Sequence, residues 1–80
     1  MDESPTIIYS HCNFVEKCHK EEDALAFVDL WKTMISTLQA THDVYIRVEP
    51  QIAMDRQFET DTTDWVARAR FSVSLRRRNG

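Results

Sequence analysis

Residues 65–75 read Trp-Val-Ala-Arg-Ala-Arg-Phe-Ser-Val-Ser-Leu, and this stretch decides the fold. Its odd positions are all apolar, while the even positions after Val66 are Arg or Ser. A period of two is the pattern of a β-strand with one buried and one solvated face. We therefore expect a strand whose odd face is buried and whose even face is outward, with Arg68, Arg70, Ser72 and Ser74 on the outward side.

A second strand is expected just upstream, where Val44, Ile46 and Val48 form the buried face and Tyr45 and Arg47 the outward one. Pro50 follows, and because proline has no N–H for a ladder it marks a bulge, a break or an edge position.

The polar run at 59–64, Glu-Thr-Asp-Thr-Thr-Asp, is expected to connect the two strands as a hairpin. Aspartate tolerates the left-handed conformation, so the hairpin can turn although the chain's one glycine is Gly80.

Residues 21–42 carry the period of an amphipathic helix. Apolar residues recur at steps of three and four, at Ala24, Phe27, Val28, Trp31, Met34, Ile35 and Leu38. Acidic residues at 21–23 suit the positive end of the helix dipole, and we expect the helix to stop at 41–43. An Asn-x-x-Glu capping box at Asn13 offers an earlier start.

A short first strand is expected at Thr6–Cys12, from its β-branched and aromatic residues. The sequence thus predicts an α+β fold of two layers in the order β-α-β-β. One main amphipathic helix packs on a three- or four-stranded, mostly antiparallel sheet. We expect a single domain over 1–80 with flexible ends at 1–5 and 76–80. One sheet face and at least one strand edge should stay uncovered.

The shortage of glycine excludes several classes of enzyme. Residues 1–79 contain none, so there is no phosphate-binding loop, no dinucleotide-binding turn and no nucleophile elbow. Acid–base or nucleophilic chemistry would need one of the three histidines beside a carboxylate or a cysteine. A two-layer domain of this size has little room for a ligand pocket, so we expect no enzyme activity and no cofactor.

The chain lacks the basic start and apolar run of a signal peptide and any apolar run near the length that spans a bilayer. Two cysteines do not make a secreted disulfide framework. We expect a soluble, cytoplasmic protein that does not bind membranes.

A mirrored cluster, His11-Cys12 and Cys18-His19, allows three interpretations. The first is a structural zinc site, although adjacent residues of a strand point to opposite sides. The second is a Cys12–Cys18 disulfide. The third, which we favour, treats both cysteines as small buried hydrophobes and places the histidines at a strand-to-helix corner, with no metal bound.

Charge divides the chain. The net charge is −3, yet every lysine lies in the first half and every arginine in the second. The outward sheet face therefore has three interpretations: a solvated face with cross-strand pairs to Glu49, a surface for an acidic protein, and a nucleic-acid surface. The candidate partner-binding residues are Tyr45, Arg47, Trp65, Arg68, Arg70 and Arg76, with Trp65 as a rim anchor.

These features favour a non-catalytic protein-interaction module that docks through this face and the strand edges. It would be a small regulator or inhibitor of a protein partner, or a homo-oligomeric assembly subunit such as a homodimer. In element order and size it resembles small phage-encoded proteins that bind and redirect host enzymes. The alternative is a nucleic-acid-binding module that uses the same face.

Overall fold

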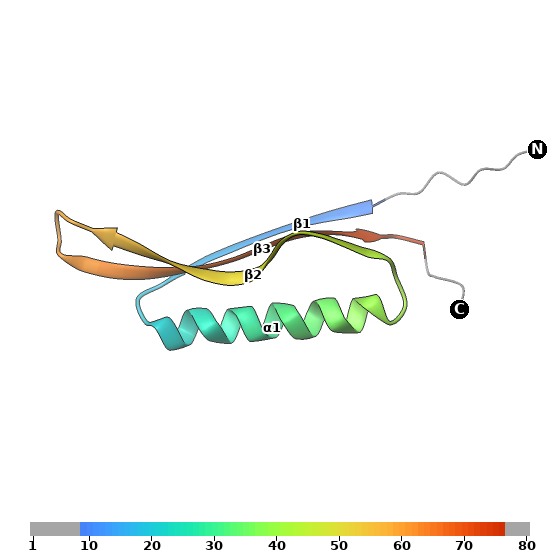
Figure 1. The fold of residues 1–80 in the computed structure, drawn as a ribbon, viewed down its shortest axis with the longest axis horizontal. Helices are drawn as coiled ribbons and strands as arrows, with labels where there is room; N and C mark the ends of the chain where they lie inside the picture. The colour runs from blue at the N-terminus through green and yellow to red at the C-terminus, as the bar shows by residue number, and fades with distance from the viewer. Residues whose placement is uncertain (1–8, 77–80) are drawn as a thin grey trace, which may run out of the picture.

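A computed structural model describes residues 9–76 (Figure 1). It contains β1 (Tyr9–Cys18), α1 (Glu21–Gln39), β2 (Val44–Gln57) and β3 (Thr62–Ser74). The strands form one antiparallel sheet in the order β1-β3-β2, and α1 lies along one face. The predicted two-layer α+β fold in the order β-α-β-β is confirmed, with three strands. The predicted flexible ends lie outside the described residues, except Arg76.

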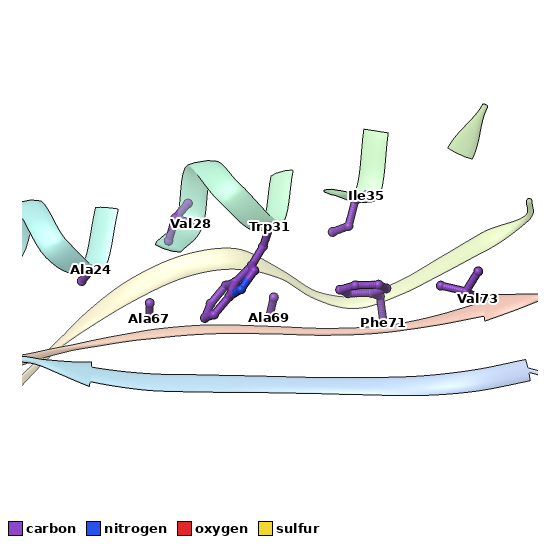
Figure 2. Close-up of a cluster of buried hydrophobic side chains, with 8 residues drawn as sticks. All are labelled: Ala24, Val28, Trp31, Ile35, Ala67, Ala69, Phe71 and Val73. Carbon is purple, nitrogen blue, oxygen red and sulfur yellow. The ribbon is translucent and has the colours of Figure 1, made fainter. Parts of the chain in front are cut away.

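The core lies between α1 and the odd-numbered face of β3 (Figure 2). Its buried members are Ala24, Val28, Trp31 and Ile35 of α1 and Ala67, Ala69, Phe71 and Val73 of β3. Phe14 of β1 closes one side, with its ring centroid 5.4 Å from that of Trp31 and 5.7 Å from that of Phe71. The two periodic patterns of the sequence therefore meet face to face.

The helix begins at Glu21, so the earlier start at Asn13 is wrong. Asn13 pairs with Arg70 inside β1, which continues to Cys18 instead of stopping at Cys12. A strand forms here instead of an early helical turn because Cys12, Phe14 and Cys18 all pack against the core from one side of an extended chain. Residues 6–8 of the predicted first strand lie outside the described residues.

The helix ends at Gln39, just before the predicted stop. The backbone N–H groups of Thr41 and His42 donate to the Leu38 carbonyl at 3.1 and 2.7 Å, which closes the end without a glycine.

Two register shifts interrupt the pairing of β2 with β3, one between Ile46 and Val48 and one between Val48 and Gln51. Each extra residue reverses the alternation of side chains. Val48 therefore pairs with Arg70 on the side away from the helix, and its predicted place on the buried face is wrong. Pro50 lies in the second shift and on an edge strand, as its missing N–H predicts.

The hairpin between β2 and β3 projects beyond the start of α1 (Figure 1). Asp61 in its turn has φ 53°, and its Oδ1 accepts a hydrogen bond of 3.0 Å from Arg56. The expectation that aspartate makes this turn without glycine is confirmed.

Three residues near the end of β3 differ from the prediction. Ser72 and Ser74 are buried although they lie on the outward face, and Leu75 is exposed. Ser72 pairs with His11 on one side and Tyr45 on the other, so two larger side chains shield a small one. Leu75 follows the last strand residue, where the sheet no longer holds it against the core.

Candidate binding face of the sheet

The sheet face opposite α1, called here the open face, is not covered by any element in residues 9–76. Residues directly opposite one another in an antiparallel pair share a face, so the register defines its members. They are Tyr9, His11, Asn13, Val15 and Lys17 of β1, Tyr45, Arg47, Val48, Gln51, Ala53 and Asp55 of β2, and Asp64, Val66, Arg68, Arg70, Ser72 and Ser74 of β3.

Three arginines on the open face have no carboxylate within ion-pair distance among the described residues. They are Arg47, Arg68 and Arg70, all exposed. The cross-strand pair expected with Glu49 does not form, because the second register shift turns Glu49 toward a groove lined by Lys32 of α1. The basic part of the face is thus not neutralised from within the described chain.

Two adjoining hollows lie around Arg47 in this basic part, and a third, of about 260 Å³, is lined by Arg68 and Arg70 together with Val48. One, of about 260 Å³, is lined by Arg47 and Arg70 together with His11 and Asn13. The other, of about 270 Å³, lies between Tyr9 and Tyr45 and shares Arg47, His11 and Ser72 with the first.

Local contacts position the side chains around the hollows. The guanidinium carbon of Arg47 lies 5.7 Å from the centroid of the Tyr45 ring, a cation–π distance. A hydrogen bond of 2.7 Å joins His11 Nδ1 to Ser72 Oγ. One hollow therefore offers two guanidinium groups and neutral polar groups from all three strands.

Two like charges on one small hollow repel each other, although water screens part of that repulsion. An oxyanion between Arg47 and Arg70 would remove the repulsion and accept charge-assisted hydrogen bonds. The planar guanidinium group suits carboxylate and phosphate oxygens in particular. The geometry is that of a shallow site for anionic groups.

The far end of the open face is different, because its charges are paired. Lys17 Nζ lies 3.5 Å from Asp55 and 3.8 Å from Asp64, and His19 Nδ1 lies 2.9 Å from Asp64. Asp64 is buried at 8% exposure. This cluster at the hairpin end therefore contributes to the fold and leaves little free charge.

The structure brings together four of the six candidate partner-binding residues, namely Tyr45, Arg47, Arg68 and Arg70, on the open face. Trp65 lies on the opposite face, half-buried at the rim of the core and opposite Cys18. Arg76 is exposed in the bend after β3.

Sequence reasoning missed other members of the face, namely Tyr9, His11, Asn13 and Val48. The alternation of Cys12, Phe14 and Cys18 was the signal that β1 continues to Cys18. That longer strand would have placed Tyr9, His11 and Asn13 on the open face.

The mirrored cysteine and histidine residues do not form a metal centre. Cys12 and Cys18 lie on the helix-facing side of β1, opposite Phe71 and Trp65, whereas His11 lies on the open face. No group of three metal-binding side chains occurs within residues 9–76. Both cysteines were expected to be small buried hydrophobes, and they do pack against the core, but each is only partly buried. His19 lies at the predicted strand-to-helix corner, whereas the same prediction for His11 is wrong, because β1 continues to Cys18 and His11 pairs with Ser72 inside it.

The disulfide interpretation is wrong, since both thiols are free. Six residues of extended chain separate them by about 20 Å, far beyond the reach of a disulfide. Burial raises the pKa of the Cys18 thiol, and the carboxylates of Asp23 and Glu16 raise this pKa further.

Comparison with family models, with curated proteins and with solved structures found no match to this chain. In the described residues, no helix is long and apolar enough to cross a membrane.

Proposed function

We propose that this protein is a non-catalytic, cytoplasmic interaction module that binds an acidic surface of a protein partner through the basic part of its open face. In this role it acts as a small regulator or inhibitor of the partner.

One observation carries the proposal. Within residues 9–76, Lys17, His19 and Arg56 each lie within 4 Å of a carboxylate, whereas Arg47, Arg68 and Arg70 do not. Exposed arginines collected on an uncovered sheet face raise the local positive potential and steer anionic partners toward it.

The type of side chain also supports a protein partner. Tyrosine and arginine are enriched at protein interfaces, and Tyr45 is 61% exposed beside Arg47. A carboxylate side chain of the partner fits the hollow between Arg47 and Arg70, and the tyrosines beside it supply apolar contact area.

A nucleic-acid partner is the second candidate, because phosphates also suit paired arginines and bases stack on tyrosine. The acidic net charge of −3 and the carboxylates at the start of α1 disfavour it, since both repel a polyanion as large as a nucleic acid.

The test compares two double variants with the same change in charge. Arg68→Glu with Arg70→Glu reverses the open face, and Lys32→Glu with Arg56→Glu reverses two cations on the other side of the molecule. Binding of a fluorescent deca-glutamate peptide and of a single-stranded oligonucleotide is measured at low and moderate salt.

Support for the proposal is peptide binding that the open-face variant weakens by at least about tenfold and the control leaves within about twofold. Tighter binding of the oligonucleotide, with a steep salt dependence lost in the same variant, would favour the nucleic-acid function instead. Equal losses in both double variants would show that net charge alone matters, and the proposed docking face would then be rejected.

A further inference from the structure

The two edges of the sheet differ in how far they are protected against pairing with another strand. Natural edge strands are blunted by proline, bulges and charge. The β2 edge has Pro50 and two register shifts. The β1 edge is ten residues of regular strand with no proline and no bulge. No strand of the described residues pairs with its outer backbone N–H and C=O groups, which form a continuous template for one more strand.

A groove lies between the Cys18 end of this edge and the flank of α1. Its volume is about 520 Å³, and its apolar lining is Cys18 of β1 and Ala26, Phe27 and Leu30 of α1. Lys17, His19 and Asp23 complete the lining. Leu30 is 55% exposed and Phe27 is only half-buried. The three strands therefore do not cover the whole apolar surface of α1. The uncovered part, at Phe27 and Leu30, lies on the β1 side.

We propose that a second copy of this chain occupies this edge, with the two β1 strands paired antiparallel about a twofold axis. The three-stranded sheets join into one sheet of six strands. The two α1 helices lie on the same face, with Phe27 and Leu30 of each copy turned toward the other.

The position of the twofold axis along β1 decides whether Phe27 and Leu30 of the two copies meet. An antiparallel pair related by a twofold axis has that axis perpendicular to the sheet, so both helices share one face. With the axis at Asn13, the distance from Cys18 to the axis is about 16 Å of strand. The helix, which starts beside Cys18, covers that distance in about eleven residues, which places Leu30 next to the axis.

The spacing of the layers agrees with this arrangement. If each helix lies over its own β3, the two helices are separated by three strand spacings, about 14 Å. Directly packed helices lie about 8–10 Å apart, so large apolar side chains are needed to fill the remaining space. Phe27 and Leu30 are such side chains, and both are placed at this flank.

Charges in β1 are compatible with the same register. With the axis at Asn13, Glu16 lies opposite Ser10 and Lys17 opposite Tyr9 of the other copy, so no like charges face each other. The self-pairing leaves the open face free and is independent of the function proposed for that face.

The mutational test uses two leucines of α1 that differ in position but not in chemistry. Leu30 lines the groove at the β1 edge. Leu25, 45% exposed, lies five residues away and thus about 140° around the helix. Dimerisation of wild type, Leu30→Glu and Leu25→Glu is measured by sedimentation from micromolar to millimolar concentration, after circular dichroism has shown that each variant is folded.

The expected result is a dimer whose dissociation constant rises at least about tenfold in Leu30→Glu and stays within about twofold in Leu25→Glu. A wild type that remains monomeric throughout the series overturns the proposal. Equal weakening by both variants also overturns it, because the groove would then not be the contact.

Hydrogen exchange on the wild type gives a second test that needs no variant, should Leu30→Glu fail to fold. The amides of β1 should exchange more slowly as concentration rises, while those of β2, the other edge, stay unchanged. Protection that grows at β2 instead, or at neither edge, refutes β1 pairing.

Discussion

Truncation of Phe71 should lower the free energy of unfolding more than truncation of any other residue in this fold. It is the largest fully buried side chain, at 1% exposure, and it lies on the central strand beneath α1. Its ring meets that of Phe14 edge to face, with an angle of 75° between the planes. Phe71→Ala removes this ring from between the helix and the sheet. The cavity left behind cannot easily be filled by movement of α1 or β1.

The size of the effect follows from the burial. Truncation of a fully buried phenylalanine to alanine costs about 3–5 kcal/mol, and the lost aromatic pair accounts for about 0.5–1.5 kcal/mol of that range. A domain of this length has a free energy of unfolding of about 4–12 kcal/mol. Phe71→Ala should therefore remove about half of it. With a urea m-value of about 1 kcal/mol/M, the midpoint of unfolding falls by about 3–5 M.

The assay is urea unfolding followed by circular dichroism and by the fluorescence of buried Trp31. Phe58→Ala is the matched control, because Phe58 is 84% exposed at the hairpin and its truncation should change the free energy of unfolding by less than about 0.5 kcal/mol. Phe71→Leu, with a loss of roughly 1–2 kcal/mol, supplies the comparison if the alanine variant does not fold. Equal midpoints for Phe71→Ala and Phe58→Ala would refute the placement of the core.

Asp61→Val should lower the free energy of unfolding by about 1–2 kcal/mol, because a β-branched residue is disfavoured at φ 53° and cannot accept the hydrogen bond from Arg56; thermal unfolding measures the loss. Native Cys18 should be alkylated by iodoacetamide more slowly than in the urea-unfolded chain, because its raised pKa keeps the thiol protonated, and Asp23→Asn should speed the reaction; peptide mass spectrometry reads the rates. As pH rises past the ordinary thiol pKa of 9.0, the unfolded chain loses the Cys18 proton first, so this thiol should make stability fall with pH. Asp64→Asn should lower the free energy of unfolding by about 1 kcal/mol, because it removes the ion pair with Lys17 and weakens the hydrogen bond with the exposed His19. The part due to Lys17 should shrink in high salt, and unchanged stability would show that the buried carboxylate contributes nothing.

The helix and the central strand were predictable because each carries a regular period over many residues. The stripe from Ala24 to Leu38 and the alternation from Trp65 to Val73 needed only the periods of 3.6 and two residues. The turn at Asp61 was predictable from the chemistry of aspartate. These features depend on local geometry, which a single sequence contains.

The first strand and the bulges depend on contacts that a local pattern does not contain. Asn13 can cap a helix in isolation, and only pairing with Arg70, far along the chain, makes it part of a strand. Pro50 indicated one irregularity in β2, but no residue around Arg47 indicated the register shift that turns Val48 outward. The basic hollow was consequently predicted only in part: its residues on β2 and β3 were foreseen, and those on β1 were not.

The position of β3 between β1 and β2 has a consequence for the order of folding during synthesis. Both outer strands hydrogen-bond to β3 and not to each other, yet β3 follows them in the chain. A chain that has emerged from the ribosome only as far as Gln57 can form α1 but has no sheet to cover the apolar stripe around Trp31. At a synthesis rate of about 5–20 residues per second, this stripe remains exposed for about 1–3 seconds until β3 has emerged as well. A chain arrested with only β1, α1 and β2 outside the ribosome should therefore be recognised by chaperones, whereas emergence of Ser74 allows all three strands to pair at once.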